Sequence, residues 1–183
     1  VSKNVISRMS ADKVYEKLAA WAKEFDVEFY GIISKDPDYT KQILQIGRGG
    51  NKPRKDLETW KDAKGYMGFF FPEYFRFDEK PEGFAKEDVV PILEEFSEQY
   101  DIDDEQNVWF DKVKAIGEKH GFCPNIKEYK ANPDAYKGSV ADVSAFIRAA
   151  VTGKLNSPDL CLVMKILGRD ESLNRIKNFK ETL

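Results

Sequence analysis

Hydrophobic side chains recur every three or four residues along most of the chain, and this spacing predicts a succession of amphipathic helices. The clearest of them lies between Ser139 and Gly153. Its apolar face holds Val140, Val143, Phe146, Ile147, Ala150 and Val151. The Ser139 hydroxyl is placed to cap this helix, and Asp142 puts a carboxylate near the free amides of the first turn. Gly153 can end the helix in the left-handed conformation.

A second helix is expected directly after this one. Residues 154–156 form a short link, and Ser157 and Pro158 are typical of an N-cap and a first helical position. The apolar run that follows stops at Gly168. The two helices would therefore meet at a short polar corner.

Capping residues and proline predict further helix starts. In the first half of the chain they are Ser10, Asp36 with Pro37, and Asp56, whereas Asp26 is expected only to end the helix that follows Ser10. The helix after Ser10 would bury one face made of Val14, Leu18, Trp21, Ala22 and Phe25. The helix after Asp56 would run through Phe70, because Pro72 cannot continue the hydrogen bonding.

The second half continues the helical pattern. Helices are expected over residues 86–100, from a cap at Asn107 to Gly121, around Asn132 and Pro133, and over residues 171–179. Strand-like alternation is not convincing anywhere, so the predicted fold is all-α. Proline, glycine and charged residues cluster over residues 72–83, and we place a boundary there between subdomains 1–75 and 76–183.

Charge is unevenly distributed along the 183 residues. The net charge of −3 is the sum of +3 over residues 1–71, −11 over residues 72–111 and +5 over residues 112–183. Lysine and arginine in the two flanks could release counterions from an RNA backbone, which the middle would repel. The alternative is that the acidic middle is simply a solvated surface.

Composition points to a core-forming chain in a reducing compartment. Apolar residues make up 42 % and charged residues 33 %, and no apolar run approaches the roughly 20 residues that a bilayer requires. Two cysteines do not suggest a disulfide framework, so a cytoplasmic location is expected. The N-terminus has no signal pattern. Because the chain begins at Val1 rather than at methionine, we expect an excised fragment of a longer protein.

Catalytic and metal-binding patterns are weak. The only candidate metal ligands are His120, Cys123 and Cys161, which lack the paired motifs of a structural zinc site. The single histidine comes without a nucleophile elbow, and the glycines near Arg48 lack the lysine and serine that end a phosphate-binding loop. We therefore predict no catalytic residue and no metal in this chain.

The corner carries a resemblance to a known family. The run from Ile147 to Gly153, the Ser157-Pro158 pair and the Leu167-Gly168-Arg169-Asp170 ending resemble the end of bacterial glutamyl-tRNA synthetases. Residues 52–71 and 129–153 resemble the longer, clostridial-type members. The resemblance implies an all-α anticodon-binding region of a class I synthetase that binds tRNA(Glu), with tRNA(Gln) left open, and acts as a monomer. The HIGH and KMSKS signatures are missing, so ATP with Mg would serve only the full-length ligase and this fragment would be inactive.

The resemblance also assigns roles to residues. It implies that Arg148, Ser157 and Leu160 contact anticodon bases, while Thr152, Gly153 and Pro158 shape the same pocket. Apart from the resemblance, the loop that carries Arg48, Lys52, Arg54 and Lys55 is either an ordinary solvated turn or a contact to RNA, for which Arg54 and Lys55 are the candidates. A glutamine that relatives can carry is Ala145 here, which removes one expected contact. The alternatives are a solvent-directed Arg148, a merely capping Ser157, a core Leu160 and, for the whole chain, a helical protein-interaction scaffold.

Overall fold

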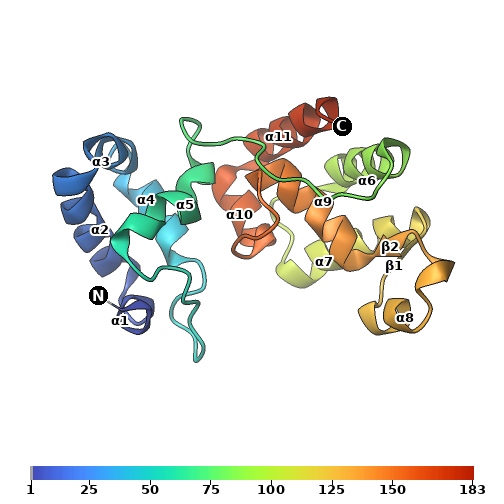
Figure 1. Cartoon of the computed structure of the whole chain (residues 1–183), viewed down its shortest axis with the longest axis horizontal. Coiled ribbons are helices and arrows are strands. Elements are labelled where there is room, and N and C mark those ends of the chain that lie inside the picture. Colours follow the sequence, from blue (N-terminus) through green and yellow to red (C-terminus); the bar gives the residue numbers. More distant parts are fainter. Residues whose placement is uncertain (1) are drawn as a thin grey trace. The chain divides into compact units, whose positions relative to one another are not determined.

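Helices dominate the computed structural model, which describes residues 2–183 (Figure 1). Within these residues there are eleven α-helices, three short 3-10 helices and one pair of two-residue strands. The all-α prediction is therefore confirmed. The chain divides into two compact units, Val1–Phe75 and Arg76–Leu183. No helix in the described part of the chain is both long enough and apolar enough to cross a membrane.

The first unit begins with four α-helices and ends in a series of short helical turns. Its elements are α1 (Lys3–Ser7), α2 (Ala11–Phe25), α3 (Val27–Ile33), α4 (Pro37–Gln45), η1 (Trp60–Asp62), α5 (Ala63–Met67) and η2 (Gly68–Phe70). The predicted caps form: the side chains of Ser10 and Asp36 accept hydrogen bonds from amides three residues on. Asp26, which was expected only to end α2, also caps α3 in this way. Helix α2 packs on both α3 and α4 and buries Val14 and Leu18 completely.

Two expectations for the first unit were wrong. Asp56 does not cap a helix, because its carboxylate accepts both hydrogen bonds of the Arg54 guanidinium, and the helical turns begin at Trp60 instead. There Asp62 accepts a hydrogen bond from the amide of Thr59 at 2.8 Å. Phe25 was placed on the buried face of α2, yet it is 66 % exposed at the end of that helix.

The second unit is built around α9 (Val140–Thr152), which packs against three other helices (Figure 1). These are α6 (Lys86–Gln99), α7 (Gln106–Lys119) and α11 (Arg169–Glu181). The remaining helices are α8 (Ile126–Ala131), η3 (Pro133–Ala135) and α10 (Leu160–Leu167). The predicted cap of α9 is confirmed: Ser139 accepts from Ala141, Asp142 accepts from the amide of Ser139, and Gly153 follows with φ of 71°.

A short strand pair in the second unit escaped prediction. Strand β1 (Phe122–Cys123) pairs in parallel with β2 (Gly138–Ser139), and Phe122 stands opposite Gly138. Two residues are too few to show the alternation by which a strand is recognised.

One helix boundary in the second unit also differs from expectation. Helix α7 starts one residue before Asn107, with Glu105 at the N-cap position. Helix α6 agrees with the predicted range 86–100 and contains Pro91, although proline lacks the amide of a helical hydrogen bond.

Candidate nucleic-acid interface

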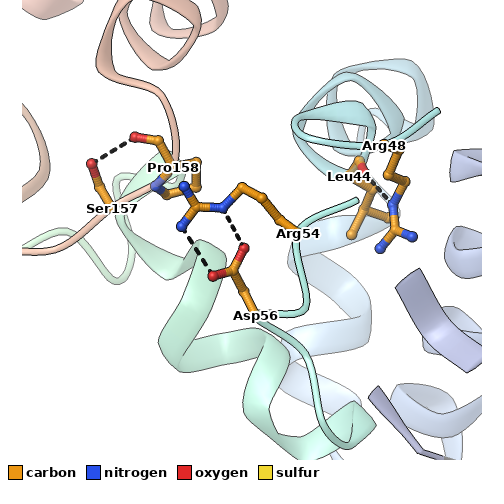
Figure 2. Close-up of polar contacts among 6 residues, drawn as sticks. All are labelled: Leu44, Arg48, Arg54, Asp56, Ser157 and Pro158. Atoms are coloured by element: carbon orange, nitrogen blue, oxygen red, sulfur yellow. Dashed lines mark hydrogen bonds and ion pairs between the residues drawn. The ribbon is translucent and has the colours of Figure 1, made fainter. Parts of the chain in front are cut away.

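Six of the predicted RNA-binding residues gather where α9 ends and α10 begins, which we call the corner (residues 148–160). At its centre the Arg148 Nε donates a hydrogen bond of 2.9 Å to the Ser157 hydroxyl. That hydroxyl in turn donates to the carbonyl of Pro158 at 2.9 Å (Figure 2). Ser157 therefore fixes the orientation of the Arg148 guanidinium. Because Arg148 is only half-buried, this guanidinium still reaches the surface.

Thr152 and Gly153 are buried and give the corner its shape. The Thr152 hydroxyl donates to the Arg148 carbonyl at 2.7 Å and accepts from the Lys154 amide at 3.1 Å. The Gly153 carbonyl accepts hydrogen bonds from the amides of Asp78 and Glu79. A Cβ at Gly153 would lie 1.8 Å from the carbonyl oxygen of Arg76, so this position requires glycine.

Two acidic residues that the sequence interpretation did not connect with the corner support it. Lys154 pairs with Asp78 at 2.7 Å, and the Leu155 amide donates to the Glu79 carboxylate at 2.8 Å. Both contacts join residues 76 positions apart in the chain. No local sequence signal could have revealed them.

The predicted cap of α10 was wrong by two residues. Asp159, rather than Ser157, occupies the N-cap position, and its carboxylate accepts from the Leu162 amide at 2.9 Å and from the Gln106 side chain. Ser157 is unsuited to this role because its hydroxyl is engaged with Arg148 and Pro158. Leu160, the first residue of α10, is only 4 % exposed and packs as a core side chain.

This assignment predicts a stability difference between neighbouring variants. Asp159→Ala should lower the free energy of unfolding by about 1 kcal/mol, because it removes the cap of α10. Asp159→Asn should stay within a few tenths of a kcal/mol of wild type, since asparagine caps equally well. Urea unfolding followed by circular dichroism measures both, and a loss for Ser157→Ala larger than that for Asp159→Ala would contradict the assignment.

The other two predicted RNA contacts lie in the first unit, on the loop between α4 and η1. Arg54 makes a two-pronged ion pair with Asp56, with distances of 2.6 and 3.0 Å (Figure 2). Its charge is thus balanced within the loop. Lys55 is exposed and lines an open cleft beside the loop. Behind the loop, burial and the nearby Asp56 raise the pKa of Tyr66 to about 12, so this phenol stays neutral.

The candidate metal ligands have other partners. The Nε2 of His120 lies 2.7 Å from the Glu95 carboxylate, and this contact together with Lys119 lowers the pKa of Glu95. Cys123 donates to the Asn125 carbonyl and, like Cys161, is buried as a free thiol. Among residues 2–183 no group of three histidine, cysteine, aspartate or glutamate side chains could hold a metal ion.

Comparison with known proteins agrees with the resemblance seen in the sequence. Residues 130–180, which contain the whole corner, match a family model described as an anticodon binding domain. The chain is 42 % identical to a glutamate–tRNA ligase of Clostridium beijerinckii over 98 % of its own length and 34 % of the relative's. It is 39 % identical to one of Acetivibrio thermocellus and 41 % identical to one of Sorangium cellulosum, with similar coverage.

The chain thus spans about a third of the length of these relatives. A crystal structure of a glutamate tRNA ligase from Elizabethkingia meningosepticum shares the fold, with a TM-score of 0.59 and 17 % identity over 100 % of this chain and 31 % of that one. The predicted resemblance to glutamyl-tRNA synthetases is confirmed.

Proposed function

We propose that this chain is the anticodon-binding part of a glutamate–tRNA ligase, in which the corner recognises the anticodon of tRNA(Glu). The observation that carries the proposal is the similarity to such ligases over 98 % of the chain, with the corner inside the matched anticodon binding domain. The chain alone would bind RNA and catalyse nothing.

The geometry of the corner suits the reading of unstacked bases. Sequence-specific RNA recognition relies on hydrogen bonds to base edges and on apolar platforms for splayed bases. Arg148, oriented by Ser157, would supply a planar set of donors to a base edge. Leu155, which is 43 % exposed in the link between the two helices, offers an apolar surface in the same corner.

The buried members of the corner would act indirectly. Thr152, Gly153, Pro158 and Leu160 are all buried, so their role is to hold the backbone that presents Arg148 and Ser157. In the whole ligase, ATP with Mg²⁺ would be used to attach glutamate to the tRNA. These 183 residues would contribute tRNA binding to that reaction. No reaction step is assigned to this chain, because it carries no class I nucleotide signature. The energy of anticodon binding would then favour the transition state at the distant acceptor end.

The test is equilibrium binding of the chain to labelled tRNA(Glu), measured by fluorescence anisotropy between about 50 and about 300 mM salt. Unlabelled anticodon-substituted tRNAs and tRNA(Gln) serve as competitors. We expect tRNA(Glu) to compete best at every salt concentration. Equal competition by all RNAs would contradict anticodon recognition, and an absence of saturable binding would favour a protein-interaction scaffold.

A further inference from the structure

The first unit contains a positively charged cleft that is separate from the corner. Its volume is about 760 Å³, and it lies between the loop after α4 and the turn after α1. Four cationic side chains line it: Arg8, Arg48, Lys52 and Lys55. No aspartate or glutamate is among its lining residues.

The positive charge of the cleft is not balanced within the described part of the chain. None of its four cationic side chains forms an ion pair there, whereas Lys41, Arg54 and Lys64 of the same unit each pair with a carboxylate. Uncompensated cations that share one concave surface attract an anion and repel one another. The cleft therefore favours a negatively charged ligand.

Arg48 is held in place for such a ligand. Its Nε donates to the Leu44 carbonyl (Figure 2), and its Nη1 donates to the carbonyls of Ile6 at 2.7 Å and Met9 at 3.3 Å. Its Nη2 makes no hydrogen bond within residues 2–183. Burial lowers the pKa of Arg48, as expected for a guanidinium that has lost water and has no carboxylate partner.

The backbone of the loop adds donors to the same cleft. The amides of residues 49–52 donate no hydrogen bond to any other described residue, and Gly49 adopts a φ of 80°. The cleft thus offers backbone N–H groups together with guanidinium and ammonium groups. Phosphate oxygens are acceptors only and match this set.

We propose that this cleft binds phosphate groups of the RNA backbone and anchors the RNA without reading its sequence. The inference rests on the proposed RNA-binding function and extends it to a second, chemically distinct site in the first unit. The volume exceeds that of a single phosphate, and three of the four cationic side chains are exposed, as an extended polyanion requires. The anchor would supply affinity, whereas the corner would supply selectivity.

The experiment compares two double variants of the full chain that remove the same charge. Lys52→Gln with Lys55→Gln removes two lysines from the cleft. Lys23→Gln with Lys61→Gln removes two exposed lysines of the same unit that lie outside it and form no ion pair within residues 2–183. The probes are tRNA(Glu) and an RNA hairpin that has the anticodon stem but an unrelated tetraloop. Circular dichroism first establishes that each variant keeps its helical content.

We expect the cleft variant to bind both RNAs about tenfold more weakly, and the slope of log affinity against log salt to fall by about two. The control variant should show less than half of either effect. Equal losses of affinity for the two variants would overturn the proposal that the cleft anchors RNA. A loss of affinity confined to the RNA that carries the anticodon would overturn it as well.

The two proposals fail in different ways in this experiment. The wild-type chain could bind tRNA(Glu) and the tetraloop hairpin equally, while only the cleft variant loses affinity. This result would overturn anticodon recognition and would support phosphate binding by the cleft. Wild-type selectivity for tRNA(Glu) with no effect of the cleft lysines would overturn the anchor alone. An absence of binding to either RNA would overturn both.

Discussion

Replacement of Gly153 by alanine is expected to lower the free energy of unfolding of the second unit by at least about 3 kcal/mol. Two costs combine at this position. The φ of 71° is left-handed and costs an L-residue about 1–2 kcal/mol, and the new Cβ would meet the Arg76 carbonyl oxygen at 1.8 Å. To relieve that contact, the segment that donates to the Gly153 carbonyl would have to move.

A second glycine separates these two costs. Gly83 has a φ of 82° but no atom within 4 Å of its would-be Cβ, so Gly83→Ala should show the backbone cost alone, about 1–2 kcal/mol. Urea unfolding of both variants, followed by circular dichroism, gives the comparison. Equal destabilisation by the two substitutions would show that the close approach of residues 76 and 153 does not hold in solution.

Arg148→Ala should weaken binding of tRNA(Glu) by about 10- to 100-fold, the range expected for loss of a two-pronged contact to a base edge. Binding of an anticodon-substituted tRNA should change much less. The reason is that a contact to a base edge carries sequence information, whereas a contact to phosphate weakens all RNAs alike. Anisotropy titrations with both RNAs measure the difference.

A conservative variant distinguishes geometry from charge at this position. Arg148→Lys keeps the positive charge but removes the planar guanidinium and the Nε that donates to Ser157. We expect it to lose most of the anticodon preference and to retain a larger share of the overall affinity. Full retention of preference by the lysine variant would mean that only charge matters there.

The sequence predicted the parts of the fold that local signals determine. Ser139, Asp142 and Gly153 mark the two ends of α9 within a few residues of the helix itself, and all three play the predicted roles. The same holds for Asp36, whose carboxylate reaches an amide only three residues away. Capping depends on short-range geometry, so it is readable before the fold is known.

What the sequence could not show depends on which side chain wins the competition for a polar group and on partners far along the chain. Ser157 followed by proline is as good a capping signal as Ser139, but Arg148 engages its hydroxyl and leaves the cap to Asp159. In the same way, the Asp56 carboxylate accepts hydrogen bonds from Arg54 and does not cap a helix. Asp78 and Glu79 support the corner from 76 positions away, and their spacing carries no signal.

The candidate site rests on resemblance more than on pattern. The structure places Arg148 and Ser157 in contact and buries Leu160, which a helical pattern alone also assigns to the core. Arg8 was missed as a member of the cationic cleft, because its exposed side chain is one of many surface cations in the sequence. Only the fold shows that it shares the cleft with Arg48.

A protein–RNA double-mutant cycle tests whether Arg148 reads the anticodon. Wild-type chain and Arg148→Ala are each titrated with tRNA(Glu) and with the same tRNA carrying one substituted anticodon base. We predict a coupling free energy of at least about 1 kcal/mol for one anticodon position. Coupling indistinguishable from zero at all three positions would contradict anticodon recognition by Arg148.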